Sequence, residues 1–305
     1  MSSIAYVFPG QGSQSVGMLA EIAQAYPTIK SCFDEASSAL GYDLWDLVQN
    51  DKNGQLNQTH ITQPALLTAS VALWRVAVEK GMQPEYLAGH SLGEYSALVC
   101  AGVISLSDAV KLVEARGQFM QKAVPAGEGA MYAIIGLDDA AIKTCCETAA
   151  AESGQVVAPV NYNSPGQVVI AGTTKAAELA ATGCTEAGAK RALPLAVSVP
   201  SHCMLMKPAA ESLAERLDDI EFKTPTIPVV NNVDVAIESE PTKIKDALVR
   251  QLYMPVRWTE SVQTLAGKGV TQIFEVGPGK VLCGLIKRID RSISAAPLND
   301  AAHFE

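Results

Sequence analysis

The sequence predicts an α/β protein in which a large domain with a mostly parallel sheet carries a small inserted βαββαβ domain. Over residues 4–101, short apolar strand segments alternate with helical segments, and this order builds parallel sheets. From residue 129 onward the segments follow the order strand, helix, strand, strand, helix, strand, which is that of a ferredoxin-like unit. We therefore expect the large domain to comprise residues 1–124 and 204–305, and the small domain to comprise residues 125–203.

The opening part of the chain supplies one strand and two long helical segments. Residues 4–8 form an apolar run that a proline and a glycine break, as expected for a buried strand. A helical pattern then covers residues 17–40 with a break near Pro27, and another helix is expected over residues 64–80.

The stretch GHSLG, with Ser91 at its centre, lies between a strand expected over residues 86–88 and a helix expected over residues 93–101. The pattern G-x-S-x-G lets a chain turn so sharply from strand to helix that the serine hydroxyl is exposed. The helix that follows is apolar on nearly all sides, which indicates a buried position. Its N-terminus would direct unpaired N–H groups toward an oxygen that develops charge beside Ser91. The large domain is therefore expected to be α/β-hydrolase-like, with Ser91 as a candidate nucleophile.

The remaining segments complete both domains. In the small domain we expect strands at residues 130–137, 156–163, 167–173 and 189–199, and helices at residues 138–151 and 175–187. In the large domain, which resumes at residue 204, we expect helices at residues 208–217 and 243–252 and strands at residues 227–233 and 272–277.

Composition and charge disfavour several classes of protein. Hydrophobic residues make up 48% and charged residues 18% of the chain, which is the balance of a compact folded protein. No leader segment or membrane-spanning run is apparent, so we expect a cytoplasmic protein with no membrane partner. The net charge of −9 disfavours nucleic acid, although basic clusters near residues 190 and 287 are either solvated surface or contacts for an acidic partner. The 7 cysteines include no C-x-x-C pair, so no metal site is expected.

A serine nucleophile needs a general base, and the sequence contains 4 histidines. His90 is adjacent to Ser91 and would have to point elsewhere. His303 lies near the end of the chain, and His60 lies in a polar stretch ahead of an expected helix. His202 follows the last strand of the small domain, where the chain returns to the large domain and a cleft is expected. It is the preferred base, and a histidine satisfied in the core is the alternative.

Arg116 lies on or beside the apolar stripe of a helix expected over residues 105–124. The apolar residues three and four positions away from it are Leu112, Val113, Phe119 and Met120. A guanidinium in this position requires an anion. The anion is either an internal carboxylate or a substrate carboxylate, which arginine can bind through two parallel hydrogen bonds. A side chain that snorkels to solvent is the third alternative.

The glycine-rich opening loop, FPGQGSQ, matches neither phosphate-binding fingerprint, because it lacks a third glycine and no G-K-[ST] follows. A nucleotide site is therefore not expected. The flexible backbone of this loop could instead present the N–H group of Gln11 to the reaction centre.

These motifs together resemble those of a known family. The malonyl-CoA:acyl carrier protein transacylases of bacterial type II fatty acid synthesis contain, in the same order, segments similar to FPGQGSQ, GHSLGEYSALVCAGV, VEARGQFM, NYNSPGQVVIAG, PSHCMLMKPA, PVVNNVD and EVGPGKVL. The resemblance covers nearly the whole chain.

The resemblance implies a ping-pong transfer of a malonyl group from malonyl-CoA to the phosphopantetheine thiol of acyl carrier protein. Ser91 would be the nucleophile and His202 the base, and Arg116 would hold the malonyl carboxylate. The family's other functional positions correspond to Gln11 and Leu92 for a backbone oxyanion hole, Gln251 for a main-chain carbonyl that orients the histidine, and Gln63 and Gln167 for the acyl pocket. We also expect a monomer without any cofactor beyond the CoA and phosphopantetheine of its substrates.

Other functions remain open on the sequence. A serine hydrolase such as a short-chain thioesterase would use the same sharp turn around its serine, but its neutral acyl substrate would leave the charge of Arg116 unpaired. A non-catalytic module that binds a carrier protein would lack the nucleophile or the base, and both are present. Cys203 is an alternative nucleophile that nothing in the sequence marks as activated.

Overall fold

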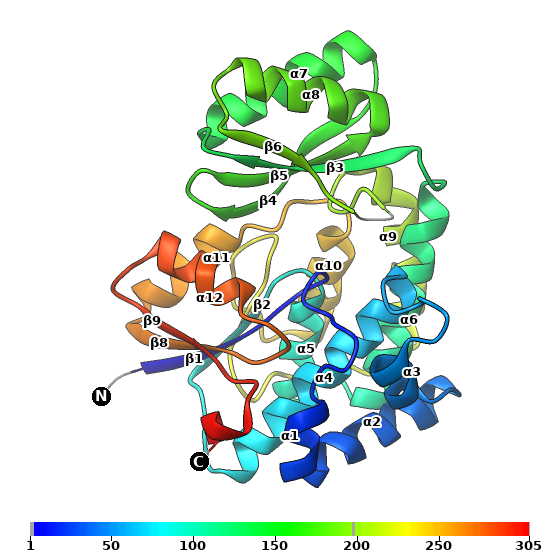
Figure 1. Cartoon of the computed structure of the whole chain (residues 1–305), viewed down its shortest axis with the longest axis vertical. Helices are drawn as coiled ribbons and strands as arrows, with labels where there is room; N and C mark the ends of the chain where they lie inside the picture. Colours follow the sequence, from blue (N-terminus) through cyan, green and yellow to red (C-terminus); the bar gives the residue numbers. More distant parts are fainter. Residues whose placement is uncertain (1–2, 197–198, 305) are drawn as a thin grey trace.

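Two sheets, each with its own covering helices, make up the described part of the protein (Figure 1). The computed structural model describes residues 3–196 and 199–304. In the view of Figure 1 the smaller sheet and its helices lie at the top, and the larger sheet lies below them. The prediction of a mixed α/β fold with a parallel sheet is confirmed.

In the described residues, the larger sheet has five parallel strands in the order β7-β2-β1-β8-β9. They are β1 (Ser3–Phe8), β2 (Tyr86–Gly89), β7 (Val229–Val230), β8 (Val270–Glu275) and β9 (Ser294–Pro297). The central strand β1 is buried on both faces, because Tyr6 packs into one core cluster and Val7 into another. Phe8 at the end of β1 pairs with Gly89 at the end of β2, so the loops after these strands leave the same edge side by side.

Helices cover both faces of the larger sheet. One layer consists of α1 (Ala20–Ala25), α2 (Pro27–Leu40), α3 (Leu44–Asn50), α4 (Thr59–Glu79), α5 (Leu92–Cys100), α6 (Leu106–Ala123), α9 (Lys207–Asp218) and α10 (Pro241–Gln251). The opposite layer consists of α11 (Trp258–Gly267) and α12 (Val281–Ile289). In α5 every residue except Val99 is buried, so the helix after Ser91 lies in the core.

The helix α4 is long and apolar enough, by length and composition, to cross a membrane. In this structure 83% of its most apolar window is buried inside the protein, as in the core helix of a folded domain. It begins at Thr59, whereas the sequence predicted a start at residue 64. The predicted start was therefore too late, and Pro64 lies inside the helix. His60 consequently belongs to the first turn of α4, not to a stretch ahead of it.

The smaller sheet is antiparallel and has the strand order β4-β5-β3-β6. Along the chain its elements are β3 (Gly129–Ile135), α7 (Asp139–Ser153), β4 (Val157–Ser164), β5 (Gln167–Thr173), α8 (Thr174–Glu186) and β6 (Arg191–Pro194). Both helices pack on one face, around Ile134 and Ile170. Backbone hydrogen bonds in both directions between Val256 and β4 tie this sheet to the larger unit.

Some elements differ from those predicted. The structure adds α3, α11, α12 and β9, of which β9 is a short edge strand with the sequence SAAP, poor in strand-forming residues. The strand predicted over residues 189–199 is restricted to β6, and residues 197–198 lie outside the described residues. The strand predicted over residues 227–233 is restricted to the two residues of β7.

Candidate active site

Ser91 lies in a strained turn between β2 and α5. Its φ of 52° is in the left-handed region, which residues other than glycine rarely adopt. The turn packs closely against its surroundings: a Cβ atom on Gly89 would lie 1.9 Å from Gly93, and a Cβ atom on Gly93 would lie 2.0 Å from Phe8. Close packing therefore requires both glycines of GHSLG, and the turn leaves Ser91 at the wall of a cleft.

His202 is hydrogen-bonded to the Ser91 hydroxyl. Its Nε2 lies 2.8 Å from Ser91 Oγ, and its Nδ1 lies 2.6 Å from the main-chain carbonyl oxygen of Gln251. Because a carbonyl can only accept, Nδ1 carries the proton and Nε2 is free to accept one from Ser91. Burial, followed by the nearby charge of Arg116, lowers the pKa of His202 to about 3, so the ring is neutral at neutral pH.

Arg116 is buried, with only 1% of its surface exposed, and lines the same cleft. Its Nη1 donates to Gln63 Oε1 (2.7 Å), and its Nη2 donates to Gln251 Oε1 (2.9 Å). The same Nη2 lies 3.4 Å from Ser91 Oγ. Within the described residues, no carboxylate oxygen lies within 4.0 Å of this guanidinium, and Nε has no hydrogen-bond partner. Arg116 therefore neither forms an internal ion pair nor extends to solvent. The neutral side-chain amides of Gln63 and Gln251 hold its guanidinium beside Ser91.

Gln251, at the C-terminal end of α10, connects these groups and is completely buried. Its carbonyl oxygen accepts the hydrogen bond from His202, and its side-chain oxygen accepts the one from Arg116. Its side-chain Nε2 donates to the Ser91 carbonyl oxygen (3.0 Å) and to Glu94 Oε2 (2.9 Å). Gln251 thus forms hydrogen bonds with His202, with the backbone of Ser91 and with Arg116.

Glu94 and Asn232 belong to the same buried network, and sequence reasoning missed both. Glu94 Oε2 accepts from the Asn232 N–H (3.0 Å), and Asn232 Oδ1 accepts from the Ser91 N–H (2.8 Å). Burial raises the pKa of Glu94 to about 7. The position of Glu94 in a helix that reads as apolar and buried could have identified it, because a buried carboxyl group needs specific partners.

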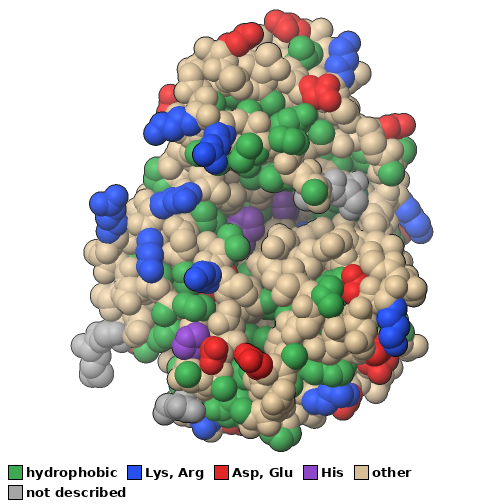
Figure 2. Space-filling model, in the orientation of Figure 1, with side chains coloured by type: hydrophobic (Ala, Val, Ile, Leu, Met, Phe, Trp, Pro, Cys, Tyr) green, Lys and Arg blue, Asp and Glu red, His purple; other side chains and the backbone are tan. Residues whose placement is uncertain are grey.

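A cleft of about 670 Å³ opens above Ser91 between the two units. Figure 2 shows it as a hollow with histidine side chains at its floor and Lys and Arg side chains along its left rim. Gln11 and Leu92 line the cleft, so the backbone after β1 and at the start of α5 borders it. Gln167 also lines it and accepts a hydrogen bond from Arg288.

The structure separates Gln63 from Gln167. Gln63 is buried and its amide contacts Arg116 and the Met120 sulfur, so it lies behind the guanidinium. Gln167 comes from the smaller sheet and lies near the rim of the cleft, where its partner Arg288 is exposed.

The other histidines do not contact the Ser91 hydroxyl. His90 Nε2 lies 2.7 Å from Asn163 Oδ1 on β4, so this ring points toward the smaller sheet. His60 and His303 make their hydrogen bonds with other residues. Cys203 is buried, and burial raises its pKa to about 11, so it is a neutral thiol at neutral pH and a poor nucleophile.

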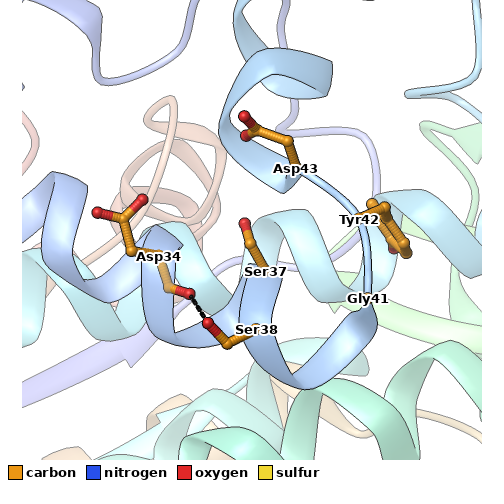
Figure 3. Close-up of a pocket in the computed structure, with 6 residues that line it drawn as sticks. All are labelled: Asp34, Ser37, Ser38, Gly41, Tyr42 and Asp43. Carbon is orange, nitrogen blue, oxygen red and sulfur yellow. Dashed lines mark hydrogen bonds between the residues drawn. The ribbon is translucent and has the colours of Figure 1, made fainter.

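A second hollow, of about 400 Å³, lies at the turn between α2 and α3 (Figure 3). Its lining residues are Asp34, Ser37, Ser38, Gly41, Tyr42 and Asp43. Their polar groups serve the local turn: Ser38 donates to the Asp34 carbonyl oxygen, and Asp43 accepts from the N–H of Asp46 at the start of α3. The part of the chain that the structure describes also has no group of three or more His, Cys, Asp or Glu that could hold a metal ion.

Comparisons with known proteins agree with the motifs. The sequence matches the acyl transferase domain family over residues 5–301. The malonyl CoA-acyl carrier protein transacylase of Salmonella typhimurium is 64% identical over 303 residues, which cover 99% of this chain and 97% of that protein. The transacylase of the same name from Bacillus subtilis is 48% identical over 305 residues, which cover 100% of this chain and 96% of that protein.

Solved structures agree with the fold. An acyl carrier protein S-malonyltransferase from Vibrio cholerae superimposes with a TM-score of 0.96 at 63% identity, covering 99% of this chain and 98% of that one. A malonyl-transacylase solved in complex with a type II PKS acyl carrier protein superimposes with a TM-score of 0.97 at 61% identity, with the same coverage. This chain therefore belongs to the acyl transferase family and, within it, to the malonyl CoA-acyl carrier protein transacylases.

Proposed function

We propose that this protein transfers the malonyl group of malonyl-CoA to the phosphopantetheine thiol of acyl carrier protein through a malonyl-serine intermediate, and thereby supplies the elongation unit for fatty acid synthesis. Its family membership supports this activity. The observation that carries the choice of substrate is Arg116, a buried cation without a carboxylate partner among the described residues, 3.4 Å from Ser91 Oγ. An acyl group that ends in a carboxylate completes the coordination of this guanidinium.

In the first half-reaction Ser91 Oγ attacks the thioester carbonyl carbon while His202 Nε2 accepts its proton. The C–S bond of the tetrahedral intermediate then breaks, and the proton passes from His202 to the departing CoA sulfur. The backbone N–H groups of Gln11 and Leu92 are the proposed oxyanion hole. Leu92 is the first residue of α5, so the positive end of the helix dipole favours charge on this oxygen.

In the second half-reaction the phosphopantetheine thiol of acyl carrier protein takes the place of CoA. His202 accepts the thiol proton, the sulfur attacks the malonyl-serine ester, and the proton returns to Ser91 Oγ as the C–O bond breaks. The carbonyl of Gln251 keeps the Nδ1 proton of His202 in place throughout, and its position at the C-terminal end of α10 favours the imidazolium that forms transiently.

The malonyl carboxylate would also act on the base. The charge of Arg116 lowers the pKa of His202, and a carboxylate bound to Arg116 offsets that charge. A malonyl substrate therefore makes His202 a stronger base than a neutral acyl group does. A thioesterase for short neutral acyl groups would lack this gain and would leave a buried charge unpaired.

The two predicted acyl-pocket residues receive different proposed roles. Gln63 orients Arg116 from behind, because its amide oxygen accepts from Nη1. Gln167 contributes to the pocket from the rim, where it contacts Arg288.

We also propose the finer organisation that the sequence predicts, an α/β-hydrolase-like domain of residues 1–124 and 204–305 and a ferredoxin-like domain of residues 125–203. The strand order of the smaller sheet, with α7 and α8 on one face, supports the second part. We infer a cytoplasmic monomer that needs no cofactor beyond the CoA and phosphopantetheine of its substrates and no nucleic-acid or membrane partner. Light scattering tests whether the protein is a monomer, and cell fractionation tests whether it is cytoplasmic.

Intact-protein mass spectrometry tests the proposed function. Brief mixing with malonyl-CoA should give a malonyl adduct on Ser91 that persists alone and moves to phosphopantetheinylated acyl carrier protein when that is added. Rapid loss of the adduct to water without transfer would instead identify a thioesterase. The absence of any adduct would remove Ser91 as the nucleophile.

A further inference from the structure

Glu94 is a buried carboxyl group that the transfer reaction leaves without a role. It lies on α5, three residues after Ser91, and only 2% of its surface is exposed. Its Oε2 accepts two hydrogen bonds, one from the Asn232 N–H and one from Gln251 Nε2. Asn232 and Gln251 also form hydrogen bonds with the Ser91 backbone. Each of these two neutral residues therefore connects the Glu94 carboxyl group to the turn at Ser91.

The charged and titratable groups that face Glu94 come from three elements. Arg116 on α6 attracts its negative charge, with the Gln251 amide between the two groups. Asp234, in the loop after β7, repels that charge, but Asp234 is itself paired with Arg250 at 2.7 Å. Tyr95, its neighbour on α5, is a neutral phenol at neutral pH, because burial raises its pKa to about 12.

A malonyl group on Ser91 changes the charge of this cluster. The unloaded site holds one cation, Arg116, and one carboxyl group, Glu94, which burial leaves poorly solvated. The malonyl carboxylate adds a second negative charge beside Arg116, in a region of low dielectric where like charges repel strongly. Either Glu94 or the malonyl group must then give up part of the stabilisation that Arg116 provides.

We propose that Glu94 takes up a proton from solvent when a malonyl group is loaded on Ser91, so that Arg116 can serve the substrate carboxylate alone. The inference rests on the proposed function, because it requires an anionic acyl group beside Arg116. Glu94 touches no reacting atom and acts through Gln251, so it is a positioning residue that adjusts the charge of the site to its occupant.

The titration of Glu94 supports this proposal. Burial raises its pKa to about 7 in the unloaded protein, while the charge of Arg116 opposes that rise. A malonyl carboxylate offsets the charge of Arg116, so loading raises the pKa of Glu94 further and converts a partly ionised group into a neutral acid. His202 also gains basicity, but its pKa starts at about 3, so it stays neutral at pH 7.

The proton balance of the loading step makes the effect measurable. When Ser91 is acylated, its proton moves through His202 to the CoA sulfur, and free CoA leaves as a neutral thiol at pH 7. The transfer itself therefore neither consumes nor releases a proton. Any net uptake at this pH reports on a group of the protein.

A pH indicator in weakly buffered solution measures this uptake directly. With less malonyl-CoA than protein, and with the malonyl adduct counted by mass spectrometry, we expect uptake of roughly half a proton per adduct at pH 7. The uptake should fall toward zero at about pH 5.5, where Glu94 is already protonated before loading. The variant Glu94→Gln keeps an acceptor oxygen for both donors and should form the adduct without uptake.

The buried carboxyl group of Glu275 provides a matched control. It is completely buried on β8 and its pKa is raised by burial, but it bonds to the N–H of Cys283, outside the Arg116 network. The variant Glu275→Gln should load with the same proton uptake as the unmodified protein. Equal loss of uptake in both variants would overturn the assignment to Glu94.

Two further outcomes are decisive. An unmodified protein that forms the adduct without proton uptake would overturn the proposal and leave the proposed function intact, whereas absence of the adduct would contradict the function itself. If Glu94→Gln does not fold, infrared difference spectra of the unmodified protein replace it. Loading should then produce a protonated-carboxyl band that ¹³C-labelled malonyl does not shift, and the absence of that band would refute the proposal.

Discussion

The floor and the rim of the cleft each hold an arginine against a neutral amide, but the arginine at the floor is buried and the one at the rim is exposed. At the floor, Arg116 is buried and neutral amides hold it, with no carboxylate within 4.0 Å among the described residues. Elsewhere, every ion pair in the described part of the chain joins side chains that are each at least 25% exposed. At the rim, Arg288 is exposed and bonds to the neutral amide of Gln167.

Electrostatic interactions at the floor and at the surface differ in strength. Exposed pairs contribute about 0–1 kcal/mol each, because water and salt screen them. A buried cation without a counterion is costly in the empty site and is retained where a ligand supplies the counterion. The buried charge at the floor is therefore expected to select the acyl group, and the exposed charges at the rim are expected to affect only how charged substrates approach.

Removal of the nucleophile should have the largest effect. Ser91→Ala removes the hydroxyl that bonds to His202 and should reduce malonyl transfer by about 10⁴-fold or more, measured as the initial rate of malonyl-acyl carrier protein formation. Ser96→Ala, on the same helix α5, deletes a buried hydroxyl outside this network and should retain transfer. Near-normal transfer by Ser91→Ala would contradict the covalent mechanism.

The buried carboxyl group should make stability depend on pH. The pKa of Glu94 rises from its ordinary 4.5 to about 7 on folding, so the native state binds more protons than the unfolded state between these values. The contribution of Glu94 to the free energy of unfolding is therefore present below pH 4.5 and is lost as the pH rises to 7, by up to about 3 kcal/mol.

Denaturant unfolding of the unmodified protein and of Glu94→Gln between pH 4.5 and 8 measures the contribution of Glu94 to the free energy of unfolding. The titration of His202 is common to both proteins and cancels in the difference. Relative to the variant, the unmodified protein should lose stability as the pH rises toward 7 and then level off. A difference that does not change with pH would show that Glu94 has an ordinary pKa.

Changes at the rim should have the smallest effect. Arg288→Ala removes an exposed cation and should lower kcat/KM for malonyl-CoA by only a few-fold at low salt, with the difference vanishing at high salt. Lys52→Ala, an exposed cation in a surface pair with Asp46, is the matched control and should have no effect. A large loss in Arg288→Ala that high salt does not relieve would show that Arg288 contributes strongly to substrate binding, and would contradict the weak role expected for the rim.

Local patterns in the sequence predict much of the fold, because strand and helix periodicity and the glycines around Ser91 act over short distances. Among the elements that the prediction missed, β9 has a weak local pattern because its residues are small, and pairing with β8 stabilises it. The helix α12 is amphipathic, so its pattern is present in the sequence although the prediction did not include it. The contact between Ser91 and His202 follows from the need for a base. The link from Glu94 through Gln251 to Arg116 could not be predicted, since it joins three helices through side-chain amides that no local pattern brings together.

The central claim is that the buried charge of Arg116 binds the carboxylate of the acyl group and thereby selects malonyl over neutral acyl groups. The most direct test compares kcat/KM for malonyl-CoA and acetyl-CoA in the unmodified protein and in Arg116→Ala. Loss of a buried charge pair with the substrate predicts a fall of roughly 10²–10³-fold in the malonyl-to-acetyl ratio, with acetyl transfer spared or improved. Equal losses for the two substrates would mean that Arg116 only supports the structure, and would contradict the account.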